Sequence, residues 1–278
     1  MKSNPLVAPV LKWVGGKRQL LKDIAKHIPS NYSTYYEPFL GGGAIFFALQ
    51  PNKAVVNDIN EELINVYTVI RDNLEELIED LKKHRNEASY YYEIRELDRD
   101  KKKYNQLSDV QKASRTIYLN KTCYNGLFRV NQQGEFNSPF GRYKNPNIVN
   151  ETTLRAVSNY FNKANITFKC GDFEETVKGI RKGSFVYFDP PYDPVSDSAN
   201  FTGYDKGGFA RDEQVRLKKL CDKLDIRNIK FLLSNSATDF ILELYKDYSI
   251  TVVKANRAIN SKGDKRGEVN EVLVKNYE

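Results

Sequence analysis

The order of segments in the first 60 residues constrains the fold more than any other feature of the sequence. The residue pattern predicts a short strand over 35–39, a glycine turn at 41–43, a helix over 44–49 and a buried strand over 54–56 that ends in an acid. A strand, a glycine turn, a helix and a second strand followed by a carboxylate are typical of the first unit of a nucleotide-binding α/β fold. A helix over 17–27 is expected in front of this unit.

The same alternation resumes after residue 165. We expect strands over 166–168, 184–188, 229–233, 249–253 and 269–274, with helices over 214–224 and 238–245. Alternating strands and helices imply a mostly parallel sheet that is covered by helices on both faces. Ligands of such sheets bind at the carboxyl ends of the strands, where Asp58, Asp172 and Asp189 are expected.

The middle of the chain follows a different pattern, which predicts a mainly helical insertion. Apolar residues recur there at helical spacing, and Ser108 with Gln111 matches a capping box at the start of a helix that runs to Thr122. Apolar residues on both sides of a polar turn predict one β-hairpin, from 128 to 136. We interpret the polar stretch 82–105 as a solvated helix face or loop.

The sequence therefore predicts two domains. Residues 1–60 and 165–278 would form an α/β domain that binds the ligand, and residues 61–164 would form the inserted domain.

Composition argues against several classes of protein. No apolar run approaches the ~20 residues that a membrane span needs, and the N-terminus lacks a signal-peptide core, so we expect a cytoplasmic protein. Three scattered cysteines and two histidines argue against a disulfide framework and against a zinc or histidine-rich metal site. The net charge of +7 suits a polyanionic partner, although many basic proteins bind no nucleic acid.

The strongest chemical signal is the tetrapeptide Asp189-Pro190-Pro191-Tyr192, directly after an expected buried strand. Two consecutive prolines end the strand and fix a rigid turn. The turn brings a carboxylate, a backbone carbonyl and an aromatic ring together, which suits the binding of a planar exocyclic amine. The alternative is a turn that does no more than end the strand.

A second signal, Glu37–Gly43, contains an aromatic residue and three consecutive glycines. Glycines accept positive φ and let the backbone approach a ligand closely, and a carboxylate at Asp58 can bind the hydroxyl groups of a ribose. The phosphate-binding pattern G-x-x-x-x-G-K-[ST] does not occur, and residues 12–17 also fail it. The ligand therefore need not be a triphosphate.

The motifs K-W-x-G-G-K, E-P-F-x-G-G-G, N-D, G-D-F and D-P-P-Y occur here in that order. Together they resemble the DNA adenine methylase (Dam) family, which methylates adenine N6 using S-adenosylmethionine. D-P-P-Y alone is shared with other amino-methyltransferases, but the ordered set is much more specific, and the resemblance runs from Leu11 to near Tyr277. It implies a Rossmann-like S-adenosylmethionine-dependent methyltransferase fold, with 61–164 as the DNA-binding target-recognition domain.

The resemblance also implies a set of cofactor contacts. Trp13, Lys17, Asp58 and Asp189 would contact S-adenosylmethionine, Phe39 and the turn from Gly41 to Gly43 would line its methionine end, and Asp172 and Phe173 would meet its adenine. Lys17 can neutralise the cofactor carboxylate, and Asp58 can bind the ribose diol. The alternatives are a core tryptophan for Trp13 and a solvated helix lysine for Lys17.

For catalysis, the resemblance implies that one adenine is flipped out of the duplex, at a cost of a few kcal/mol. Stacking on Tyr192 offsets part of this cost, because a base–aromatic stack contributes ~1–3 kcal/mol. Hydrogen bonds from N6 to Asp189 and to the Pro190 carbonyl would contribute further and align the amine with the methyl group. Direct transfer would then need neither a metal nor a covalent intermediate.

The hairpin region would read the DNA sequence. Arg129 would bind guanine O6 and N7, Tyr124 would wedge into the base stack, Asn125 would contact phosphate, and Leu127 and Pro139 would contact base edges. The resemblance implies GATC as the target. Some relatives carry a second arginine at the position of Phe128, which puts fine contacts in doubt. The alternative is an aromatic hairpin that packs only on its own domain.

Two further segments leave alternatives open. The loop 193–209 carries Phe201 and Tyr204, and it either orders over the flipped base or is an ordinary mobile loop. The loop 256–267 either follows phosphate or is a solvated hairpin tip; its basic residues are Arg257, Lys262, Lys265 and Arg266.

Double-stranded DNA is thus the expected partner, with a possible cognate restriction endonuclease that acts on the same site. Other interpretations keep the fold but change the substrate to cytosine N4, RNA or a protein amide. The amide is disfavoured because that group usually begins its motif with asparagine, whereas Asp189 stands here. A further alternative is a DNA-binding protein of the same fold without turnover.

Overall fold

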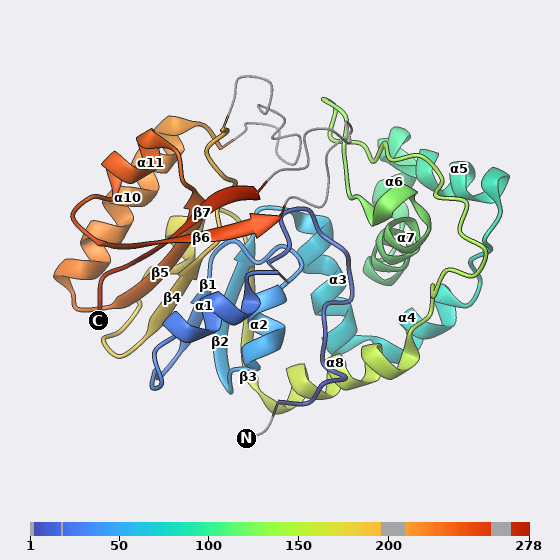
Figure 1. Ribbon diagram of the computed structural model, residues 1–278. Helices are drawn as coiled ribbons and strands as arrows, with labels where there is room; N and C mark the ends of the chain where they lie inside the picture. The colour runs from blue at the N-terminus through green and yellow to red at the C-terminus, as the bar shows by residue number, and fades with distance from the viewer. Residues whose placement is uncertain (1–2, 18, 196–208, 257–267) are drawn as a thin grey trace.

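The computed structural model describes residues 3–17, 19–195, 209–256 and 268–278 (Figure 1). A seven-stranded sheet has the order β3-β2-β1-β4-β5-β7-β6. Its strands are β1 (Tyr35–Glu37), β2 (Lys53–Asp58), β3 (Asn165–Cys170), β4 (Phe185–Phe188), β5 (Lys230–Ser236), β6 (Ser249–Asn256) and β7 (Glu268–Lys275). The pairs between β3 and β5 are parallel, and β7 is antiparallel to both β5 and β6. This confirms the predicted mostly parallel α/β sheet.

The central strand β4 is buried along its whole length, and helices cover both of its faces. Phe185 and Tyr187 face one core, and Val186 and Phe188 face the other, because successive side chains of a strand point to opposite faces. The first core includes residues of α1 (Leu21–His27), α2 (Ala44–Leu49), α3 (Glu61–Asp72) and α8 (Glu151–Lys163). The second includes residues of α9 (Phe173–Thr176), α10 (Arg211–Ile226) and α11 (Asp239–Leu244).

The register of the parallel strands brings their carboxyl ends to one edge of the sheet. Tyr35 lies opposite Ala54 on one side and Phe185 on the other, so β1 is flanked by β2 and β4. Asp58, at the end of β2, pairs with Cys170 at the end of β3. The segments that follow these strands, which contain the predicted site residues, therefore start from a common edge.

The insertion contributes helices beside the sheet (Figure 1). They are α4 (Leu74–Leu81), α5 (Ala88–Glu96), the 3-10 turn η1 (Leu97–Arg99), α6 (Lys101–Gln106), α7 (Asp109–Thr122) and the 3-10 turn η2 (Tyr124–Gly126). The flanking helices α3 and α8 share their core with the strands. The domain boundaries at 61 and 164 therefore stay a prediction.

Local sequence signals explain some helix limits and miss others. The predicted capping box is present: the Ser108 hydroxyl accepts from Gln111 N at 3.2 Å, and Ser108 N donates to the Gln111 side chain at 2.9 Å. The helix expected over 17–27 begins only at Leu21. The solvated interpretation of 82–105 holds for Lys101–Lys103 but is wrong for Asp98, which is 3% exposed because two guanidinium groups pair with it.

The predicted hairpin is present in a minimal form. Val130 and Phe136 form an antiparallel bridge, and Gly134 N donates to Asn131 O to close the turn between them.

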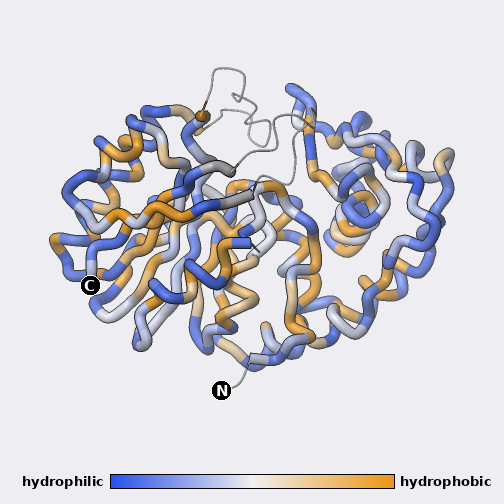
Figure 2. The backbone as a smooth tube through the Cα atoms, in the orientation of Figure 1, coloured by the Kyte–Doolittle hydropathy of each residue, from blue (hydrophilic) through white to orange (hydrophobic). Residues whose placement is uncertain are grey.

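Hydrophobic residues concentrate on the strands and on α2 and α3 (orange in Figure 2). Among the described residues, no helix is both long enough and apolar enough to span a membrane.

Candidate active site

The carboxylate of Asp189 lies at the carboxyl end of β4 and is held from two sides. Lys17 Nζ is 2.8 Å from Asp189 Oδ1, and the Ser234 hydroxyl on β5 donates to the same oxygen at 3.0 Å. Lys17 also donates to the Gly15 carbonyl at 2.7 Å, so this lysine is not a solvated helix residue. Burial raises the pKa of Asp189, and the charge and hydrogen bond of Lys17 oppose that shift.

Tyr192 lies beside this carboxylate and is held at its hydroxyl and at the face of its ring. Its hydroxyl donates to Glu271 on β7 at 2.8 Å, and Lys17 Nζ lies 4.4 Å from its ring centroid. Burial raises the pKa of the Tyr192 phenol well above its ordinary value, and the neighbouring carboxylates act in the same direction. The phenol is therefore a neutral hydrogen-bond donor near pH 7.

Side chains from two elements hold the proline turn itself. Gln214 of α10 donates to the Pro191 carbonyl at 2.8 Å, and Asp193 N donates to the Asn235 side chain at 3.0 Å. Asn235 in turn donates to Gln214 at 3.0 Å. Because Gln214 and Asn235 are fully buried, the turn is a rigid part of the structure.

The glycine turn follows β1 and is joined to the end of β2. Gly41 N donates to one carboxylate oxygen of Asp58 at 2.8 Å, and Asn60 N donates to the other at 3.0 Å. Gly41 and Gly43 have φ angles of 48° and 68°, which disfavour other residues. A Cβ at Gly41 would also lie 3.0 Å from the Trp13 ring, so packing by Trp13 is a second reason for glycine.

The adjoining pair Asp172 and Phe173 lies at the end of β3, as predicted. Asp172 caps α9 by accepting from Glu174 N at 2.9 Å, and Arg216 of α10 forms an ion pair with its carboxylate. Phe173 stacks obliquely on Phe39, with 5.3 Å between the ring centroids, and Arg216 lies 4.4 Å from the Phe173 centroid. The structure thus brings these predicted cofactor residues to one edge.

Trp13 joins the sheet edge to the inserted hairpin. Its ring stacks on Phe128 with a centroid distance of 4.6 Å and an interplanar angle of 23°. Phe128 is buried and also meets Phe136 across the hairpin. An aromatic residue at 128 therefore has a packing role here, and Trp13 is only half-buried, in contact with two cores.

The other hairpin residues divide into exposed and partly covered positions. Tyr124 is 58% exposed, and Asn125 and Pro139 are exposed beside it, since Tyr124 N donates to the Pro139 carbonyl at 2.8 Å. Leu127 is half-buried. Arg129 is half-buried, and its Nε donates to the Asn137 side chain at 2.7 Å. The structure therefore brings the predicted DNA contacts to one region, with Arg129 held by a neighbour.

Sequence reasoning missed several residues of this site. Ser234, Glu271 and Arg216 contact predicted site residues, but they come from distant elements with no motif of their own. Glu37 is also buried; it accepts from Tyr35 OH at 2.6 Å, and burial raises its pKa well above the ordinary value. Only Glu37 carried a signal, because it opens the glycine-rich motif.

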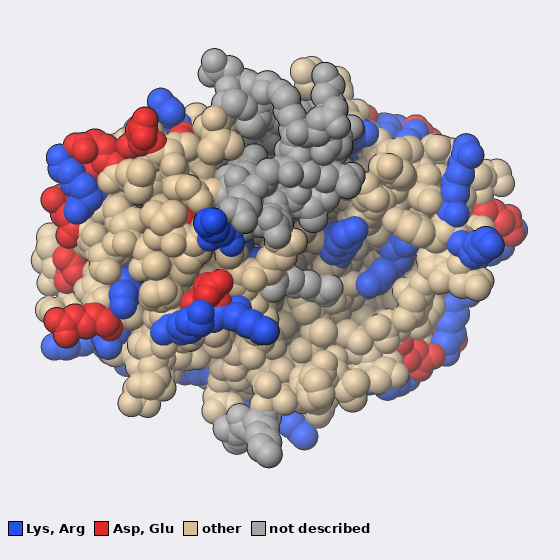
Figure 3. Space-filling model, viewed as in Figure 1, with Lys and Arg blue, Asp and Glu red and all other residues tan. Residues whose placement is uncertain are grey.

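The surface around the site has a mixed but locally basic character. Several Lys and Arg side chains lie on the visible face between the α/β part and the inserted helices (Figure 3). Residues 196–208 and 257–267, which include Phe201, Tyr204 and the basic residues of the two predicted loops, lie outside the described residues. In the described part of the chain, no group of three or more His, Cys, Asp or Glu side chains can hold a metal ion.

A mostly parallel sheet with a carboxylate, a lysine and an aromatic ring at its carboxyl edge has the character of a Rossmann-like methyltransferase. The family model for D12 class N6 adenine-specific DNA methyltransferases matches residues 13–259. The chain belongs to this family, as the motif resemblance predicted. Its class is therefore that of an adenine-specific DNA methyltransferase, rather than a cytosine, RNA or protein-amide enzyme.

Relatives of known name cover nearly the whole chain. The Type II methyltransferase M1.LlaDCHI of Lactococcus lactis subsp. cremoris is 46% identical, over 99% of this chain and 98% of its own length. The Type II methyltransferase M.MjaIII of Methanocaldococcus jannaschii is 44% identical, over 98% and 99%. The DNA adenine methylase of Escherichia coli strain K12 is 36% identical, over 95% and 93%.

Proposed function

We propose that this protein transfers a methyl group from S-adenosylmethionine to N6 of an adenine that is flipped out of duplex DNA, within the sequence GATC. The observation that carries the proposal is the position of Lys17 against Asp189 and Tyr192 at the carboxyl end of β4. A paired carboxylate beside a fixed aromatic ring suits an exocyclic amine on a planar base. Family membership supports adenine in DNA as the substrate.

In this proposal Asp189 and the Pro190 carbonyl accept the two N6 hydrogens. Lys17 and Ser234 both contact Asp189 Oδ1, so the second carboxylate oxygen, Oδ2, would accept from the substrate amine. The N6 lone pair would form the new N–C bond as the S–C bond of the donor breaks and S-adenosylhomocysteine leaves, and the methylated nitrogen would then release its extra proton to Asp189 or to water. Tyr192 stacks on the adenine, and its bond to Glu271 fixes the plane of the ring.

The residues at the sheet edge fit the methyl donor. Each carboxylate oxygen of Asp58 accepts a backbone N–H, which holds the carboxylate at the end of β2, where it would bind a ribose diol. The methionine end would lie along Phe39 and the turn from Gly41 to Gly43, near Trp13 and Lys17, and the adenine would lie against Asp172 and Phe173. When bound, S-adenosylmethionine supplies an electrophilic methyl group.

DNA would lie against the hairpin and the basic part of the surface. Arg129 would read guanine, Tyr124 would fill the space left in the base stack, and Asn125 would bind phosphate, with Leu127 and Pro139 on base edges. The exposure of Tyr124 and Pro139 supports this arrangement. The net charge of +7 supports a polyanionic partner.

Two of the relatives are named Type II methyltransferases. On that basis we propose that a cognate restriction endonuclease acts on the same site and that methylation protects the site from cleavage. Both proteins would then act on cellular DNA in the cytoplasm.

The experiment is the transfer of labelled methyl groups from S-adenosylmethionine to two duplexes, one with GATC and one in which its A·T pairs are replaced. The methylated nucleoside is then identified by mass spectrometry. The proposal predicts N6-methyladenine in the first duplex only. Equal methylation of other adenines in both duplexes would refute the sequence, and absence of N6-methyladenine would refute the function.

A further inference from the structure

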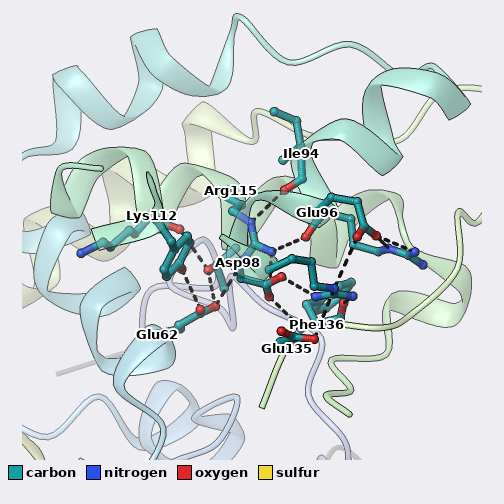
Figure 4. A network of polar contacts seen from close by, with 12 residues as sticks. Glu62, Ile94, Glu96, Asp98, Lys112, Arg115, Glu135 and Phe136 are labelled. Atoms are coloured by element: carbon teal, nitrogen blue, oxygen red, sulfur yellow. Dashed lines mark hydrogen bonds and ion pairs between the residues drawn. The ribbon is translucent and has the colours of Figure 1, made fainter. Parts of the chain in front are cut away.

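The recognition hairpin is held to the inserted helices by its backbone. Phe136 N donates to Asp98 Oδ2 at 2.7 Å, and the Phe136 carbonyl accepts from Arg99 Nη2 at 2.7 Å. These are the outward-facing N–H and C=O groups of the hairpin strand, where a further strand would otherwise pair. The side chains of Asp98 and Arg99, in the 3-10 turn η1, therefore satisfy the two backbone groups that a further strand would otherwise pair with (Figure 4).

Asp98 is itself fixed by two guanidinium groups. Arg115 Nη2 lies 2.9 Å from Asp98 Oδ2, and Arg99 pairs with the other carboxylate oxygen. Arg115 is 2% exposed and comes from α7. It also donates to the carbonyls of Ile94 and Arg95, at 2.9 and 2.8 Å, so its orientation is set by α5.

The same network reaches back to the end of β2. Glu62, in the first turn of α3, accepts from Thr116 of α7 at 3.1 Å and lies 3.9 Å from Arg115 Nη1. Arg99 Nε lies 3.4 Å from Glu135 in the hairpin turn. Buried charges that are paired in this way have few alternative arrangements, because an unpaired buried charge is costly.

The network is directly adjacent to the predicted guanine reader. Asn137 follows Phe136 in the chain, its N donates to the Arg129 carbonyl at 2.9 Å, and its side chain accepts from Arg129 Nε at 2.7 Å. The position of the Phe136 backbone thus determines where Asn137 lies, and Asn137 determines where the Arg129 guanidinium points. A bidentate contact to a base edge depends on the orientation of the guanidinium plane, which Asn137 also holds because its carbonyl accepts from Arg129 Nη2 at 3.2 Å.

We propose that Asp98, clamped by Arg115 and Arg99, is a positioning residue that sets the orientation of Arg129 and thereby the sequence specificity of methylation. This inference rests on the proposed function, since it requires Arg129 to read guanine. Asp98 contacts neither base nor cofactor in this role. Its effect passes through the Phe136 backbone and Asn137.

The test compares Asp98→Asn with wild-type enzyme on GATC and on near-cognate duplexes in which each G·C pair is replaced in turn. The amide keeps the size of the side chain but cannot pair with both guanidinium groups. We expect the ratio of kcat/KM values for cognate over near-cognate duplexes to fall about tenfold, within the range of a guanine contact. The kcat on GATC should change less than threefold.

A double-mutant cycle separates positioning from general destabilisation. In an Arg129→Ala background, Asp98→Asn should change the discrimination ratio by less than about twofold, because the reader is already absent. An equal loss with and without Arg129 would overturn the inference, as would an unchanged ratio in the single variant. Glu75→Gln is the matched control, because it breaks an exposed ion pair with Arg155 between α4 and α8.

Asp98 is buried, so folding of each variant is checked by its melting temperature and near-UV circular dichroism. If Asp98→Asn does not fold, Arg99→Gln provides the same test, since the Arg99 side chain is 25% exposed and supplies the second bond to Phe136. A failure of wild-type enzyme to prefer GATC refutes the proposed function before any variant is compared. Preference for GATC with unchanged discrimination in both variants refutes only the positioning role.

Discussion

The sheet edge and the recognition hairpin hold their functional side chains in different ways. At the sheet edge, Asp189 and Asp58 follow directly from buried parallel strands, whose register places them. The hairpin has only isolated bridges, and a buried network of charges supports it from outside. Regular strand pairing thus places the proposed catalytic residues, which side chains such as Lys17 then hold, whereas the proposed recognition hairpin depends mainly on side-chain pairing.

This difference predicts which property of the protein is lost when a side chain is removed from each region. Loss of a side chain at the sheet edge should remove activity and leave the structure intact. Loss of a side chain that supports the hairpin should alter sequence choice or the stability of the insertion while the chemistry continues. The following variants test this distinction.

The largest effect is expected at the sheet edge. Asp189→Ala should lower kcat on GATC roughly 10³-fold, because it removes the acceptor that orients the amine in the transition state. The melting temperature should also fall modestly, because the buried ammonium group of Lys17 loses its carboxylate partner, so kcat is compared for enzyme that is shown to be folded. Methyl transfer under saturating substrate measures the effect, with Asp225→Asn as an exposed control. Retained turnover would remove Asp189 from the mechanism.

The next effect should appear in the hairpin and should concern specificity. Arg129→Ala should cost about 1–3 kcal/mol of discrimination against a replaced G·C pair, with a smaller loss of nonspecific binding. Competition between duplexes at several salt concentrations measures both quantities. If the loss is equal on every sequence and the salt slope falls by about one, Arg129 is a phosphate contact.

The two histidines provide a comparison of pH effects, because His27 lies in the α/β part of the chain and His84 lies in the inserted part. His84 packs on Tyr118 in the insertion, where burial lowers its pKa from 6.5 to about 4. The unfolded chain therefore binds a proton at His84 between these values and the folded chain does not, so stability falls as pH drops from 6.5 towards 4. We expect a loss of about 3 kcal/mol near pH 4.

Urea unfolding of wild type and His84→Gln as a function of pH tests this expectation. The variant should lack that part of the pH dependence. The control is His27→Gln in α1. Partial burial is the main cause that lowers the pKa of the His27 imidazole as well. Parallel pH profiles for wild type and His84→Gln would show that His84 is not the titrating group.

The smallest effect should come from Glu271, whose hydrogen bond with the hydroxyl holds the Tyr192 ring. Glu271→Gln weakens the charged acceptor of the Tyr192 hydroxyl, and a hydrogen bond to a charged group contributes about 1.5–3 kcal/mol. Because stacking remains, we expect kcat to fall about tenfold with little change in discrimination. Tyr192→Phe should cause a similar loss, and the double variant should add little to either. Independent, additive losses would show that Glu271 acts elsewhere.

The sequence predicted the sheet edge well because local patterns determine it. Apolar strands followed by Asp58 and by Asp189-Pro190 place these residues through topology alone, and the structure has them at one edge. The sequence did not predict that Lys17 pairs with Asp189, because that contact joins segments far apart in the chain.

The support of the hairpin could not be predicted for a related reason. Asp98 stands in a polar run, and a polar run alone indicates exposure. Its burial depends on Arg115, which sits within an otherwise ordinary helix, and on a backbone group of Phe136. No periodicity or motif links these three positions, so only the folded structure identifies them.

The stacking of Trp13 on Phe128 has a consequence for the exchange of recognition segments between relatives. Trp13 lies four residues before Lys17, so the segment that delivers the lysine also packs on the hairpin. A chimera that takes its hairpin from another methyltransferase therefore has to keep a residue at position 128 that stacks on Trp13. Otherwise the transplant would change target choice and, by loosening the lysine, impair chemistry as well. Target specificity therefore cannot be transferred cleanly by exchanging the hairpin alone.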